Sequence, residues 1–99
     1  METAYSAKMA RLRAAALERP GTLPEQERRR CFEGDPPAQL APYVEKVRRH
    51  AYRVTDDDVA SLRQAGYSED QIFEATVCTA LGAGLSRLEK GLALLEQVR

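Results

Sequence analysis

The sequence contains no tryptophan, one histidine and two cysteines, and each scarcity excludes a class of site. Cys31 and Cys78 lie far apart on different expected helices. That is neither the cysteine density of a secreted disulfide scaffold nor the spacing of metal ligands. Because His50 is the only imidazole and no CxxC or CxxH pair occurs, we expect no zinc site, no haem and no iron–sulfur cluster. The sequence therefore predicts free thiols and no bound cofactor.

The sequence also lacks a long apolar run and an excess of either charge. A helix needs roughly 20 apolar residues to cross a bilayer. The N-terminus shows no basic segment followed by a hydrophobic one, so we expect a cytoplasmic protein with no membrane partner. The 15 basic and 15 acidic residues cancel, but residues 1–54 carry 11 basic and 7 acidic side chains whereas residues 55–99 carry 4 and 8. Halves of opposite charge favour packing against each other or against a second copy.

The 99 residues have the composition of one helical domain, with 43% hydrophobic and 30% charged residues. Apolar residues recur at steps of three and four, and no segment alternates as a half-buried strand would. We predict an all-α fold of about five helices in one domain, with an N-terminal helical arm at 1–37 and a helical core at 38–99. The expected helices span residues 2–18, 23–32, 38–52, 55–66 and 68 to nearly 99.

Three segments combine a Ser or Thr with the residues of a capped first turn: Thr22-Leu23-Pro24-Glu25, Thr55-Asp56-Asp57-Asp58 and Ser68-Glu69-Asp70-Gln71. Each predicts the start of a helix. Pro42 is expected in the first turn of the third helix, and Gly66 at the position just past the end of the fourth.

The last expected helix is unusual because it contains several glycines. Gly82, Gly84 and Gly91 each cost about 1 kcal/mol relative to alanine in a helix interior, so their presence needs a compensating reason. Together with Ala80 and Ala83 they make a surface of small residues on which another helix, from this chain or from a second copy, can pack closely. The alternative is a break near Gly82. We expect a homo-oligomer that assembles through this helix.

A turn between two of the expected helices carries a family resemblance. The fourth helix ends in Leu62-Arg63-Gln64-Ala65-Gly66, and Tyr67-Ser68-Glu69-Asp70-Gln71-Ile72 opens a long helix rich in small residues. This succession resembles the carboxymuconolactone decarboxylase family, in particular its alkylhydroperoxidase D-like members, over roughly residues 40–95. The resemblance implies an all-helical fold that oligomerises through its helices.

In active members the resemblance implies thiol peroxidase or disulfide reductase chemistry, carried by a Glu, a CxxC pair and a His three residues after the second cysteine. One thiolate attacks the peroxide, its neighbour resolves the sulfenic acid, and Glu and His relay protons. Neither Cys31 nor Cys78 belongs to a CxxC pair. We expect a degenerate or non-catalytic member that acts as a homo-oligomeric module. The alternatives are a thiol-dependent peroxidase that uses a single cysteine, and a binder of a small ligand between helices.

Cys78, His50 and Glu74 are the candidate catalytic residues, and each has a structural alternative. Cys78 lies in an apolar stretch where burial would raise the thiol pKa, and His50 ends the third helix, where a cation is favoured. Glu74 could pair with an arginine across helices. Cys31 follows Arg28-Arg29-Arg30, but successive helix residues lie about 100° apart, so the three arginines cannot all face a thiol that we expect to be half-buried.

Two basic clusters, Arg28-Arg29-Arg30 and the segment from Lys46 to Arg53, raise the question of nucleic-acid binding. Acidic residues are interleaved with the first cluster, and no helix-turn-helix pattern presents a recognition helix. We expect no nucleic-acid partner.

Overall fold

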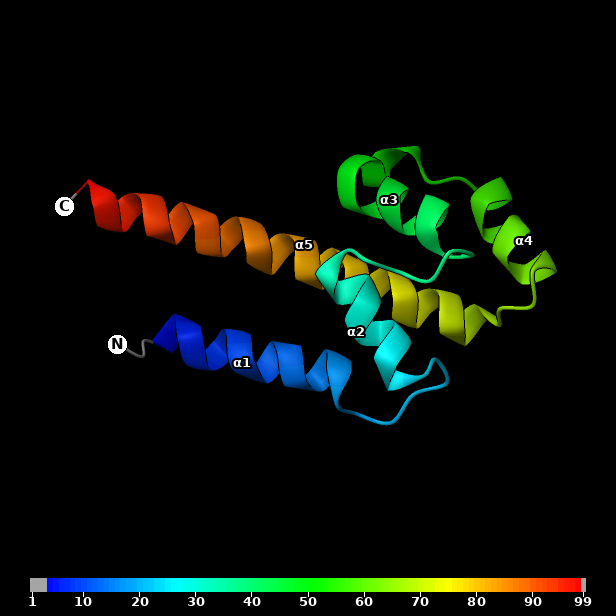
Figure 1. Ribbon diagram of the computed structural model, residues 1–99, viewed down its shortest axis with the longest axis horizontal. Coiled ribbons are helices and arrows are strands. Elements are labelled where there is room, and N and C mark those ends of the chain that lie inside the picture. The colour runs from blue at the N-terminus through cyan, green and yellow to red at the C-terminus, as the bar shows by residue number, and fades with distance from the viewer. Residues whose placement is uncertain (1–3, 99) are drawn as a thin grey trace.

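The computed structural model describes residues 4–98, with side chains from Ser6 onward, and all of its regular structure in that range is helical. The elements are α1 (Ala4–Leu17), α2 (Glu25–Glu33), α3 (Ala41–His50), the 3-10 turn η1 (Ala51–Arg53), α4 (Asp56–Gln64) and α5 (Glu69–Gln97). Figure 1 shows α5 running the length of the molecule with α1 antiparallel beside it. The predicted all-α fold of about five helices with a long C-terminal helix is confirmed.

The core forms where α2 packs across α5. A Cβ atom at Gly82 would lie 2.0 Å from the carbonyl oxygen of Phe32, so this close approach of the two backbones requires glycine. The buried cluster around the contact contains Leu17, Leu23, Cys31, Leu40, Tyr43, Val44, Val47, Leu62, Ile72, Ala75 and Cys78. Three of these residues come from the segment 1–37, which packs as part of this core.

The N-cap predicted at Thr55 and the capping box predicted at Ser68 are both present. The Thr55 side chain caps α4 reciprocally with Asp58, and Ser68 caps α5 with Gln71. Gly66 follows α4 with φ of 106°, in the left-handed region that favours glycine. The box predicted at Thr22 is wrong: Pro24 is the N-cap of α2, and no side chain caps this helix end. The Thr22 hydroxyl instead donates a hydrogen bond to Glu74 on α5.

α5 is a single helix of 29 residues and is not broken at Gly82. The buried residues of α5 all lie in its first half, between Ile72 and Ala83, where one face packs against α2, and its second half extends past α2 (Figure 1). Neither α5 nor any other helix within residues 4–98 is long and apolar enough to cross a membrane.

Candidate functional site

The structure brings together two of the three candidate catalytic residues. Glu74 and Cys78 lie one turn apart on α5, and the Cys78 thiol makes a long hydrogen bond of 3.7 Å to the carbonyl oxygen of Ala16. His50 is exposed at the end of α3, where its ring lies edge-on to Tyr52 at 6.1 Å. No hydrogen bond or ion pair within residues 4–98 joins His50 to Cys78 or Glu74.

Both thiols are free and buried, as expected for Cys78 but not for Cys31, which is fully buried rather than half-buried. Burial, with a smaller contribution from nearby Cys78, raises the pKa of Cys31 to about 11. Burial also raises the pKa of Cys78 above its ordinary value. Because the thiolate is the nucleophile, neither cysteine is activated at neutral pH.

Glu74 is a structural anchor for the loop between α1 and α2. Its carboxylate accepts hydrogen bonds from the Thr22 amide (2.9 Å), the Thr22 hydroxyl (2.7 Å) and the Leu23 amide (3.1 Å). Burial raises the pKa of Glu74, but these hydrogen bonds outweigh it, and the net pKa is lowered. A Cβ atom at Gly21 would lie 2.2 Å from Glu74 Oε1, so glycine makes room for the carboxylate.

The expected salt bridge from Glu74 to an arginine is not formed: within residues 4–98 no arginine lies within 4.0 Å of its carboxylate. Arg28 lowers the pKa of Glu74 from a greater distance and is itself used elsewhere. The Arg28 side chain is 6% exposed, and its Nη1 donates to the carbonyl oxygens of Arg19 (2.6 Å) and Ala16 (3.3 Å), where α1 ends. This role could not be predicted from the sequence, because three consecutive arginines are typical of a solvated surface.

Arg87, the other charge within the apolar part of α5, serves a second helix end. Its Nη2 donates to the carbonyl oxygen of Arg48 at 2.7 Å, in the last turn of α3, where a cation also interacts favourably with the helix dipole. Glu74, Arg28 and Arg87 therefore fix chain ends and loops, which is an architectural role.

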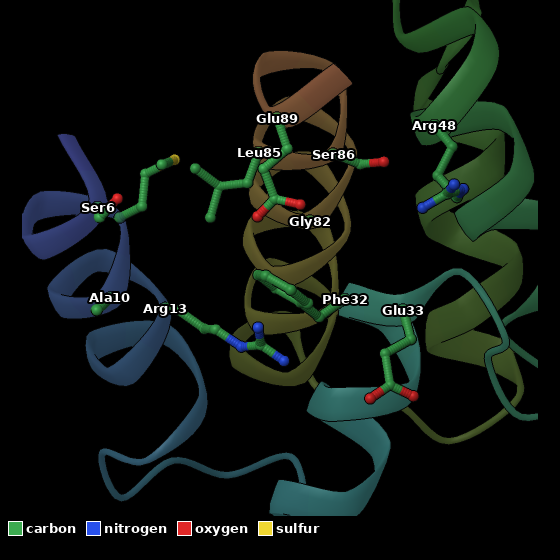
Figure 2. Close-up of a pocket in the computed structure, with 11 residues that line it drawn as sticks. Ser6, Ala10, Arg13, Phe32, Glu33, Arg48, Gly82, Leu85, Ser86 and Glu89 are labelled. Carbon is green, nitrogen blue, oxygen red and sulfur yellow. The ribbon is translucent and has the colours of Figure 1, made fainter. Parts of the chain in front are cut away.

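A groove of about 480 Å³ opens where α2 ends against α5, between α1 and α3 (Figure 2). Arg13 reaches from α1 toward the Phe32 ring, with its guanidinium carbon 5.1 Å from the ring centre. Arg48, Glu33 and Glu89 complete the charged lining, so two cations and two anions cancel. The groove holds no histidine or cysteine, and its hydroxyls are those of two serines.

No group of three His, Cys, Asp or Glu residues in the described part of the chain is placed to hold a metal ion. The groove therefore offers a contact surface of mixed charge, with two carboxylates and two serine hydroxyls in its lining.

The most distinctive surface is an exposed apolar stripe along α5. Its side chains fall within about 80° of one another on a helix of 3.6 residues per turn. Phe73 is 68% exposed, Leu95 59% and Val98 80%, and the smaller members are exposed as well. We call this surface the α5 seam, and it consists of Phe73, Val77, Ala80, Gly84, Leu88, Gly91, Leu95 and Val98.

The opposite face of α5 is the buried one. Ile72, Ala75 and Gly82 point into the core, on the side of the helix away from the α5 seam. A helix that packs on one side only is expected to be polar on the other. The α5 seam breaks that rule, since it carries no charged residue from Phe73 to Val98.

No family model matches this sequence, and no curated protein or solved structure is significantly similar to it. The family resemblance over residues 40–95 therefore stays a prediction, and the function has to be inferred from the geometry.

Proposed function

We propose that this chain is a non-catalytic helical module that assembles with copies of itself through α5, and that it is a degenerate relative of the alkylhydroperoxidase D-like proteins in the carboxymuconolactone decarboxylase family. One observation carries the proposal: the α5 seam is apolar along the whole helix and has no partner within residues 4–98. Contiguous apolar surface of this kind on a soluble domain marks a protein interface.

The state of the two cysteines supports the non-catalytic half of the proposal. A peroxidase needs a thiolate that peroxide can reach. Cys78 is 2% exposed and Cys31 is fully buried, and burial raises the pKa of both. Glu74, which would relay a proton, already accepts three hydrogen bonds from Thr22 and Leu23.

Sedimentation equilibrium of the wild-type chain at micromolar concentration tests self-assembly. We expect a mass above that of the 11.0 kDa chain, falling toward it on dilution. A monomer at every concentration would contradict the proposal.

Peroxide consumption with a thiol donor tests the non-catalytic half. We expect the wild type, Cys31→Ser and Cys78→Ser to consume peroxide no faster than the donor alone. Turnover by the wild type that Cys78→Ser abolishes would establish the single-cysteine peroxidase instead. Circular dichroism checks that both variants keep their helices.

A further inference from the structure

We propose that the partner on the α5 seam is a second copy of this chain, docked antiparallel so that the two α5 helices cross at Gly84. The inference rests on the proposed function and specifies the register of the assembly. Its basis is a symmetry in the sequence of the seam. Six seam residues form three pairs at matching distances from Gly84, at 84 ± 4, 84 ± 7 and 84 ± 11, and Val98 is the one seam residue outside these pairs.

An antiparallel pair about a two-fold axis at Gly84 places each of these residues opposite its counterpart in the other copy. Leu88 then faces Ala80, and Val77 faces Gly91. A large side chain meets a small one at these two levels, which is the interdigitation that close-packed helix contacts require, and at the third level Phe73 faces Leu95. A parallel pair in register would place Leu88 against Leu88 and Gly91 against Gly91. The two leucines would then crowd each other, and the two glycines would leave unfilled space.

The crossing point suits a close approach of two backbones. Gly84 has no atom of its own chain within 4 Å of the position where a Cβ atom would stand, whereas the same test at Gly82 meets the backbone of α2. Packing inside the chain thus explains Gly82, whereas Gly84 is open to close contact with a second copy of the chain. Antiparallel helices also place opposite ends of their dipoles together, which favours this orientation.

The area available in the seam is at the lower limit for a specific contact. The exposed fractions of the large seam residues correspond to on the order of 500 Å² of apolar surface per copy, at the usual size of these side chains. Complete burial of the seam in both copies would remove at most roughly 1,000 Å² from water, which is the lower limit for a specific interface with good complementarity. The absence of charge from the seam means that no ion has to be desolvated.

The register is tested by disulfide trapping between the full-length variants Ala80→Cys and Leu88→Cys, distinguished by a size tag and oxidised gently alone and as a mixture. We expect the mixture to give the mixed dimer at more than ten times the yield of either homodimer. The wild type is the matched control, since its two buried thiols should give no cross-link.

Preferential homodimers of each variant would overturn the antiparallel register while leaving self-assembly intact. The antiparallel register would also be overturned if the mixture gave no cross-link although the chain sediments as an oligomer. A wild-type chain that sediments as a monomer would overturn the proposed function as well, so the two failures are distinguishable.

Gly84→Leu provides a second test, because it should disturb the contact between two copies without disturbing the fold of one copy. The new side chain points into open space in one copy but meets its counterpart at the crossing. We expect the dissociation constant to rise at least 100-fold with the helical spectrum unchanged. Ala60→Leu is the matched control: it places a leucine at an exposed position of α4 and should leave the dissociation constant unaltered. An unchanged dissociation constant for Gly84→Leu would refute the crossing point.

Discussion

Replacing Gly82 with alanine is expected to destabilise the fold by about 2 kcal/mol. The added Cβ atom would lie 2.0 Å from the carbonyl oxygen of Phe32, and the next two contacts, at 2.8 and 2.9 Å, are also backbone atoms of that residue. Because no flexible side chain can move aside, α2 itself must shift. Overpacking of a core costs about 1–3 kcal/mol, and the backbone collision places this site near the upper value. Replacing glycine with alanine inside a helix stabilises the helix by about 1 kcal/mol, which leaves a net loss of about 2 kcal/mol.

Urea denaturation followed by circular dichroism measures this change. The experiment is best done with Gly84→Leu also present, so that self-association does not enter the free energy of unfolding. A loss of 2 kcal/mol lowers the melting temperature of a domain of this size by roughly 10 °C. Gly91→Ala is the matched control, because nothing lies within 4 Å of its Cβ position, and it should gain about 0.5–1 kcal/mol. If Gly82→Ala is as stable as its parent, the close packing of α2 on α5 is wrong.

Two further predictions concern Glu74 and the two buried thiols. Glu74→Gln should lose about 1–2 kcal/mol at pH 7, since it weakens charge-assisted hydrogen bonds to the α1–α2 loop. The folded-state pKa of Glu74 is lowered, so its stabilisation is present above the unfolded pKa and is lost as the pH falls through the folded pKa. Urea titrations at pH 7 and pH 3 should therefore show the gap closing, and a constant gap would contradict this role. Labelling of Cys31 and Cys78 by a disulfide reagent at pH 7 should be slow in the native protein and immediate in urea. Rapid labelling of the native protein would show that a thiol is accessible and activated.

The helices could be predicted from local signals in the sequence. Thr55 and Ser68 begin their helices as predicted because a capping box is closed by residues three positions apart. Gly66 ends α4 for an equally local reason, its positive φ. The same logic was wrong at Thr22, whose amide and hydroxyl both donate to Glu74, 52 positions later, while α2 begins after Pro24 without a side-chain cap.

The roles of the polar residues depend on distant contacts that no local pattern contains. Arg28 stands in a basic run typical of a surface, yet it is buried because the end of α1 presents carbonyl oxygens to it. The apolar pattern of α5 predicted one broad stripe, but the structure divides it into a face buried on α2 and the exposed α5 seam. The placement of α2, with α1 and α3 beside it, decides which of these faces is covered.

The light-scattering mass of the wild-type chain beside that of Gly84→Leu tests the central claim most directly. At micromolar concentration we predict about 22 kDa for the wild type, twice the 11.0 kDa of the chain, and about 11 kDa for the variant, with the same helical spectrum. A wild-type mass of 11 kDa would contradict assembly through the α5 seam, and equal masses above 11 kDa for the two proteins would show that the chains assemble through another surface.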